Sequence, residues 1–171
     1  MGLPFSFAHH FAAANTLPAL AAYRRAFRPS EHLEAPHVML GVSVLCAETD
    51  DAARWLAGPG ALAFLRLRSG HPGRYPTPEE AAEYTFTPHE REAIKAWTAS
   101  HVVGSPDTVR RRLAELVERT DADELMVATM THGSAERLRS YQLVAEAAGL
   151  TAADPPDRNG AASLLEDRAV G

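Results

Sequence analysis

The nine-residue run VMLGVSVLC, from Val38 to Cys46, constrains the fold of this chain more than any other segment. Almost every position in it is apolar, and polar residues do not alternate with apolar ones. A strand with one face in water would alternate, whereas the strands of a parallel sheet covered by helices are buried on both faces. The run therefore predicts a doubly buried strand in a parallel sheet.

Patterns typical of strands and helices alternate around this run. Leu3–Ala8 is short, apolar and aromatic, and ELMVATM at Glu124–Met130 is similar, so each predicts another strand. Stretches with helical spacing of apolar residues separate and follow these strands. The candidate N-cap residues of the helices are Asn15, Thr49, Ser105 and Ser134.

Three segments depart from this order. Gly-Pro-Gly at Gly58–Gly60 predicts the end of the helix that begins after Thr49. Ser69–Ser100 contains four prolines and predicts a long loop with one helix near Pro88–Trp97. Loops of this length in compact domains are usually functional. Residues 151–171 carry Pro-Pro, Asn-Gly and many small residues, which predicts a disordered tail.

The composition favours a globular protein of the cytoplasm. The formal net charge of −5 gives no reason to expect nucleic acid or an anionic membrane as a partner. We find neither a secretion signal nor an apolar stretch of membrane-spanning length. The single cysteine, Cys46, fits a reducing compartment, and within its apolar strand it predicts an inert core thiol.

Common site motifs are absent from the sequence. It contains no His-Glu-x-x-His and no Cys-x-x-Cys, and the adjacent pair His9 and His10 would point to opposite faces of a strand, so we expect no metal site. No Gly-x-Gly-x-x-Gly follows a strand, which weakens a dinucleotide-binding interpretation. The alternating order predicts an α/β fold with parallel strands, either doubly wound or a barrel. Three strands are too few for either fold, since a closed barrel of this kind has eight strands and about 250 residues.

Three long stretches carry a resemblance to a known family. GLPFSFAHHF at Gly2–Phe11, the segment Pro36–Arg68 and the segment Gly104–Ala147 together resemble the C-terminal half of bacterial luciferase-like flavin-dependent monooxygenases, and most closely the group 1 subgroup. The similarity runs in unbroken order from Gly2 to Leu150. It implies that residues 1–150 form the C-terminal portion of a (β/α)8 TIM barrel, with an insertion at about residues 69–100.

The same resemblance implies a reaction and its partners. Members of this family use reduced FMN and O2 to oxidise a small organic substrate, and a flavin reductase is a possible partner. A deazaflavin (F420)-dependent reductase of the same superfamily is the alternative activity. In the full barrel the three strands would be the sixth, seventh and eighth, so we expect an incomplete barrel. Such a piece would be a non-catalytic remnant, or would need a second polypeptide or self-association to cover its strand edges.

Candidate site residues lie where the predicted strands end, since chemistry in a parallel barrel gathers at the carboxyl ends of its strands. With Phe5 and Phe7 directed toward the helices, His10 would face the barrel interior, and the resemblance places a His-Phe pair at this point. His10 could donate a hydrogen bond to the flavin, or a loop carbonyl could satisfy it. Thr131 and His132, after the last strand, are the other candidate cofactor-binding residues. Glu48 could reach the site too, but support of a helix N-terminus is the favoured interpretation.

Overall fold

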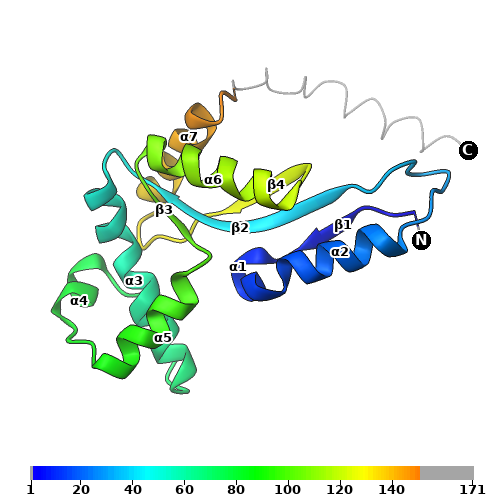
Figure 1. Ribbon diagram of the computed structural model, residues 1–171. Helices are drawn as coiled ribbons and strands as arrows, with labels where there is room; N and C mark the ends of the chain where they lie inside the picture. Colours follow the sequence, from blue (N-terminus) through cyan, green and yellow to red (C-terminus); the bar gives the residue numbers. More distant parts are fainter. Residues whose placement is uncertain (1, 151–171) are drawn as a thin grey trace, which may run out of the picture.

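A computed structural model describes residues 2–150 as an open parallel sheet with helices packed on one face and beyond one end (Figure 1). The strands are β1 (Phe5–Phe7), β2 (Val38–Cys46), β3 (Val102–Gly104) and β4 (Glu124–Ala128). The helices are α1 (His9–Ala12), the 3-10 turn η1 (Ala13–Asn15), α2 (Thr16–Ala26), α3 (Asp50–Arg68), α4 (Pro78–Glu83), α5 (Pro88–Thr98), α6 (Pro106–Thr120) and α7 (Ser134–Ala147). The predicted tail at 151–171 lies outside the described residues.

The long strand β2 is the centre of the sheet. β4 pairs with one edge of β2 along Met39–Ser43. On the other edge, β1 pairs with Val38–Leu40 and β3 with Val44–Cys46, and all three pairings are parallel. The expected α/β fold with a parallel, unclosed sheet is confirmed. β3 is an additional strand that the sequence patterns did not reveal, because three residues are too short to show a period.

The hydrophobic core lies between this sheet and the helices α2, α6 and α7. Phe5 and Phe7 pack into it as predicted, while Ser6 is exposed on the opposite face. In β2 the residues on the core side are fully buried, whereas Met39 and Ser43 on the other side are only half-buried. Burial on both faces, predicted for the whole strand, therefore holds only for its last residues. Among the described residues no helix covers the first part of the second face, which we call the open face.

Helix α3 corrects the prediction that Gly58–Gly60 ends a helix. It runs unbroken from Asp50 to Arg68, with Pro59 buried inside it. A proline in a helix loses one backbone hydrogen bond and disfavours the preceding turn. Packing of this turn compensates, since a side chain at Gly58 would lie 3.5 Å from the Ala81 Cβ and one at Gly60 3.3 Å from the Tyr75 hydroxyl. Contacts with the insertion thus outweigh the tendency of Gly-Pro-Gly to end the helix.

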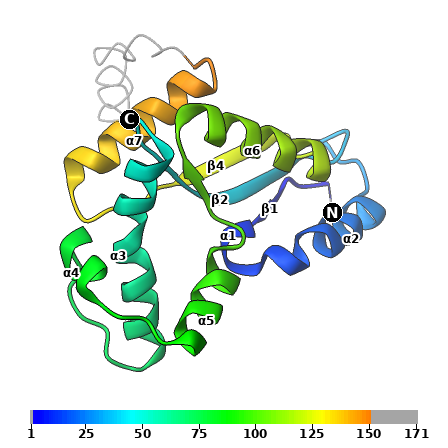
Figure 2. The same ribbon diagram turned by 60° about the vertical axis from the view of Figure 1, so that its left-hand side comes forward.

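The insertion at residues 69–100 is largely helical. It contains the predicted helix near Pro88, which is α5, and the shorter α4, which was not predicted. Both helices begin with a capping box, formed by Thr77 with Glu80 and by Thr87 with Glu90. Figure 2 shows α4 and α5 beside α3, away from α6 and α7. None of the helices described for residues 2–150 has the length and apolar character needed to cross a membrane.

The four predicted N-caps have different outcomes. Thr49 caps α3, where its hydroxyl accepts a hydrogen bond from the Ala52 amide at 3.1 Å. Asn15 and Ser105 occupy cap positions, but their side chains make no capping bond. Ser134 is the first residue inside α7, and Gly133 takes the cap position. The helix starts were therefore predicted to within one residue, but the capping contacts were not.

Candidate functional site

A cavity of about 290 Å³ opens at the carboxyl end of the sheet, between β2, α3 and α5. Segments far apart in the sequence meet there, because the insertion folds back onto α3. Its lining includes five ring-bearing residues and a methionine: Phe11, Phe64, Tyr75, Trp97, His101 and Met130. This is the end of the sheet at which parallel barrels place their chemistry. We call it the aromatic cavity.

Two stacked aromatic rings line the aromatic cavity. The rings of Phe64 on α3 and Trp97 on α5 stack with centroids 4.6 Å apart and planes inclined by 9°. His101 meets Trp97 edge-on at 4.4 Å. Gly60 makes room for this arrangement, because a Cβ there would lie 3.5 Å from the Trp97 ring and 3.3 Å from the Tyr75 hydroxyl. A lining rich in aromatic rings suits a planar or apolar ligand.

His101 supplies a polar group inside the aromatic cavity. Burial, and to a smaller extent the nearby His10, lowers the pKa of His101 below its ordinary value, so the imidazole is neutral at pH 7. Burial also raises the pKa of the Tyr75 hydroxyl, which stays protonated. Sequence reasoning missed His101 and Trp97. Trp97 ends the helix that was predicted near Pro88, and His101 follows four residues later, just beyond the predicted loop.

His10 lies beside the aromatic cavity, at a gap in the edge of β2. β1 ends opposite Leu40 and β3 begins opposite Val44, so the carbonyl of Gly41 has no strand partner on this edge. The Nδ1–H of His10 donates to that carbonyl at 2.8 Å. Since a carbonyl only accepts, Nδ1 carries the proton and Nε2 is the free ring nitrogen. The ring of His10 also packs on Phe11, which lines the cavity, at 4.1 Å.

The prediction that His9 and His10 lie in a strand is wrong. Both belong to the single turn α1, because β1 ends at Phe7. His9 is buried and its Nδ1 lies 2.8 Å from the Thr16 hydroxyl, so the two imidazoles serve different environments. The conclusion that they do not bind one metal together stays a prediction.

The candidates after β4 are engaged in local structure. Nδ1 of His132 donates to the carbonyls of Tyr75 and Pro76 at 3.2 and 3.0 Å, which ties this loop to the insertion. The hydroxyl of Thr131 donates to the Gly133 carbonyl at 2.7 Å. Neither side chain lines the aromatic cavity, although Met130 just before them does. Cofactor binding by His10, Thr131 and His132 stays a prediction.

The acidic residues after β2 hold helices together. Glu48 accepts a hydrogen bond from Arg139 on α7 at 2.8 Å, which lowers the pKa of its carboxyl. Asp50 accepts from the amide of Ser105 at 2.6 Å and from the hydroxyl of Thr108, and these bonds lower its pKa. The Asp50 carboxylate thus occupies the N-terminus of α6. The favoured interpretation, that these acidic residues support helix N-termini, applies to Asp50. Glu48 instead forms a hydrogen bond with Arg139 on α7.

Cys46 is a buried free thiol at the end of β2. Burial, and to a smaller extent the nearby Glu48, raises the pKa of the Cys46 thiol to about 11. The thiolate is the reactive form of cysteine, so Cys46 is unreactive at neutral pH. This agrees with the expected inert core thiol.

Comparisons with known proteins identify relatives over most of the chain. No family model matches. The chain is 34% identical over 143 residues to a luciferase-like monooxygenase of Escherichia coli, and these residues are 84% of this chain and 43% of that protein. The crystal structure of apo-MsnO8 superimposes with a TM-score of 0.75 and 35% identity, over 89% of this chain and 46% of the other. This chain belongs to the luciferase-like family.

Two further relatives define the extent of this likeness. Protein YvbT of Bacillus subtilis is 39% identical over 146 residues, which are 85% of this chain and 44% of YvbT. The monooxygenase RslO1 of Streptomyces bottropensis shares the fold, with a TM-score of 0.53 at 16% identity. The chain spans a little under half the length of the luciferase-like relatives that it matches. The open sheet accordingly corresponds to a partial TIM barrel.

Proposed function

We propose that this chain forms part of the active site of a luciferase-like flavin-dependent monooxygenase, which uses reduced FMN and O2 to oxidise a small organic substrate. The aromatic cavity at the carboxyl end of the parallel strands carries this proposal, since it joins an aromatic lining to the neutral imidazole of His101. The likeness to the luciferase-like monooxygenase of E. coli supports the reaction class.

The residues present fit the ring system of a flavin better than its phosphate. Stacked Phe64 and Trp97 would hold a planar tricyclic ring, with the Tyr75 hydroxyl nearby as a hydrogen-bonding group. Within residues 2–150 no Lys or Arg lines the cavity, so this lining offers no cation for a phosphate dianion. When bound, reduced FMN would supply the electrons that let one oxygen atom of O2 enter the substrate while the other leaves as water.

The chain's own side chains would bind, orient and move protons. The hydrogen bond from Nδ1 to the Gly41 carbonyl fixes the tautomer of His10. Nε2 of His10 is therefore the ring nitrogen that would accept a proton from a ligand on the open face. His101, neutral at pH 7, can donate or accept within the cavity. Phe11 and Met130 lie at its margin and would exclude water from the reacting atoms.

Partners follow from the same proposal. Reduced flavin would come from a flavin reductase, and a second polypeptide or a second copy of this chain would cover the open face. A deazaflavin (F420) has a planar ring of the same kind, so the cavity alone favours neither cofactor. A non-catalytic remnant of the family would keep the fold without binding either one.

The two tryptophans of the chain allow a direct test of cofactor binding. Trp97 lines the cavity, whereas Trp55 is 48% exposed on α3 and does not line it. In the Trp55→Phe variant all tryptophan emission comes from Trp97, and we expect saturable quenching by FMN. In the matched Trp97→Phe variant we expect quenching only by collision, which is linear in FMN.

Each outcome of this titration bears on the proposal. Parallel titrations with reduced FMN and with F420 identify the cofactor by the lower Kd. Quenching of equal form in both variants, or no saturation with any flavin, would remove the active-site assignment and leave the remnant interpretation. The measured mass of the chain, with and without flavin, shows whether binding accompanies self-association.

A further inference from the structure

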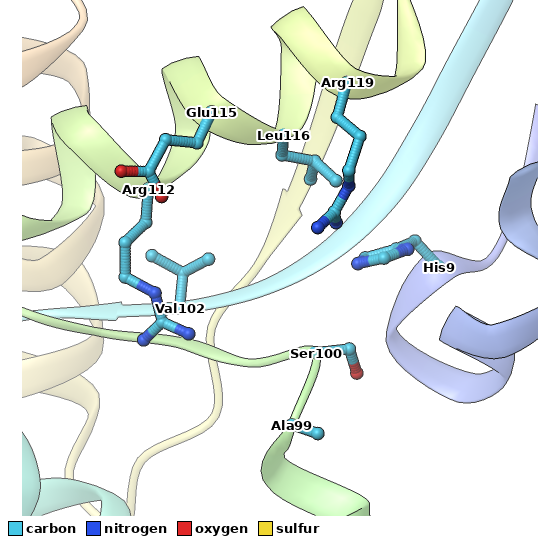
Figure 3. Close-up of a pocket in the computed structure, with 8 residues that line it drawn as sticks. All are labelled: His9, Ala99, Ser100, Val102, Arg112, Glu115, Leu116 and Arg119. Atoms are coloured by element: carbon cyan, nitrogen blue, oxygen red, sulfur yellow. The ribbon is translucent and has the colours of Figure 1, made fainter.

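A second pocket, of about 130 Å³, lies on the helix-covered side of the sheet (Figure 3). It opens between α6, the turn α1 and the segment that joins α5 to β3. Val102 lines it, whereas the next residue, Val103, lines the aromatic cavity. Successive residues of a strand face opposite sides of a sheet, so the two hollows are separate. We call this the arginine pocket.

Two arginines of α6 give the arginine pocket its character. Arg112 and Arg119 are seven residues apart, which places them two turns apart on one face of the helix. Figure 3 shows both side chains extending from α6 over the pocket. Within residues 2–150 neither forms an ion pair, although their neighbours Arg110 and Arg111 pair with Asp107 and Glu115. Of the four arginines of α6, the two that face the pocket therefore lack a carboxylate partner among the described residues.

His9 closes the pocket from the opposite side. Its Nδ1 bonds to the Thr16 hydroxyl at 2.8 Å, and Figure 3 shows the other ring nitrogen directed toward Arg119. When the Thr16 hydroxyl donates to Nδ1, the neutral ring carries its proton on Nε2. Burial, the Arg119 charge and His10 lower the pKa of His9, so the ring is neutral at pH 7. In that tautomer Nε2 of His9 can donate a hydrogen bond into the pocket beside the two arginines.

The charge of the pocket is opposite to that of the whole chain. Among the described residues that line the pocket, Glu115 is the only carboxylate, against the two guanidinium groups of Arg112 and Arg119. The chain as a whole has a formal net charge of −5. A local excess of positive charge on an acidic protein attracts anions.

An adjoining groove gives this site a second part. It measures about 390 Å³ and shares His9, Ala99, Ser100 and Arg119 with the arginine pocket. Its remaining wall is mostly apolar and consists of Ala13, Ala14, Leu17 and Pro18, with the two threonines Thr16 and Thr120. A ligand could place a charged head in the pocket and an apolar body along α2.

We propose that the arginine pocket binds a phosphate dianion, held by the guanidinium groups of Arg112 and Arg119 and by Nε2 of His9. Planar guanidinium groups match the geometry and charge of phosphate oxygens. The dianion can come from inorganic phosphate or from the monoester of a small apolar alcohol, whose body would occupy the groove beside Leu17. The site is independent of the proposed flavin chemistry, which belongs to the other face of the sheet.

Calorimetric titration of the chain with inorganic phosphate and with phenyl phosphate tests this inference. We expect saturable binding of one anion per chain at low ionic strength. Arg119→Gln and Arg112→Gln should each weaken binding about tenfold, the effect of losing one charge-assisted hydrogen bond. Arg110→Gln is the matched control, because it removes the same charge from the same helix outside the pocket and should leave Kd within about twofold.

The two titrants distinguish the sources of the dianion. Tighter binding of phenyl phosphate assigns the site to an organic phosphate, and equal binding assigns it to the free ion. Circular dichroism and the thermal midpoint establish that each variant is folded before it is titrated. Absence of saturable binding to the folded wild-type chain would overturn the inference. An equal loss of affinity in Arg110→Gln would do the same, because it would show only a general effect of charge.

Discussion

At the scale of single residues, polar side chains complete the hydrogen bonding of β2 where its neighbouring strands stop. His10 donates to the Gly41 carbonyl in the gap between β1 and β3. On the other edge, beyond β4, the Thr129 hydroxyl donates to the Val44 carbonyl at 2.7 Å and the Ser140 hydroxyl accepts from the Cys46 amide at 2.9 Å. Buried backbone groups need such partners, so these residues have a structural role whatever else they do.

The contact between Gly41 and His10 yields the first prediction. A Cβ at position 41 would lie 3.1 Å from Cε1 of His10, so Gly41→Ala should displace the imidazole from the carbonyl that it caps. We expect a loss of about 1 kcal/mol in the free energy of unfolding, typical of one hydrogen bond. Urea denaturation measures this loss, and the NMR signals of His10 report the displacement. Gly73→Ala is the control, because nothing lies within 4 Å of its Cβ position; equal losses in both variants would contradict the contact.

The Asp50 carboxylate yields a prediction on pH. Its bonds to the Ser105 amide and the Thr108 hydroxyl lower its pKa in the folded state below the ordinary value of 3.8. A lowered pKa contributes stability above the ordinary value, and this contribution is lost as the pH falls through the folded-state pKa. The wild-type chain should therefore lose stability in this acidic range more steeply than Asp50→Asn. Asp51→Asn, the neighbouring control, should keep the wild-type slope in thermal unfolding from pH 5 to pH 2.

At the scale of elements, the sequence predicted what is long and periodic. β2, α6 and α7 follow from runs of nine to fifteen residues whose apolar pattern has a clear period. β3 and α4 have three and six residues, too few to show one. α3 was predicted to end at Gly58–Gly60, because Pro59 breaks the local pattern and the packing that compensates comes from residues 75–97.

The candidate site was predictable only in part, for the same reason. His10 and the residues after β4 were found because they end recognisable strands. Trp97 and His101 come from the insertion, and their place in the aromatic cavity depends on how that insertion folds onto α3. A lining assembled from distant segments leaves no local pattern in the sequence.

The capping box of α5 yields a prediction at this scale. The Thr87 hydroxyl accepts from the Glu90 amide, and the Glu90 carboxylate accepts from the Thr87 amide at 2.7 Å. Thr87→Ala should destabilise the start of α5 by about 1 kcal/mol and loosen the stacking of Trp97 on Phe64. We expect a red shift of Trp97 emission in a Trp55→Phe background. The equivalent change at the cap of α4, Thr77→Ala, serves as control and should shift the emission less; the reverse order would contradict the proposed link between α5 and the cavity wall.

At the scale of the whole molecule, the open face leaves an apolar side chain exposed on the sheet. Core-facing Leu125 and Val127 are half-buried, whereas Met126 between them is 57% exposed and pairs in register with Gly41 of β2. Apolar side chains in such a position favour association, and the unpaired edge of a short strand adds to this tendency. A partial barrel should therefore associate through this face, with itself or with a second polypeptide.

Replacing Met126 with lysine tests the role of the open face. A charge there would have to be buried in any complex that covers the sheet, so Met126→Lys should shift the chain toward monomer at concentrations where the wild type associates. Leu138→Lys is the matched control, since Leu138 is 61% exposed on α7, on the helix side of the sheet. Sedimentation velocity over a concentration series measures both variants. If Leu138→Lys dissociates the complex and Met126→Lys does not, association uses the helix layer and the open face is free in solution. In that case the aromatic cavity would have to work with the walls that this chain alone provides.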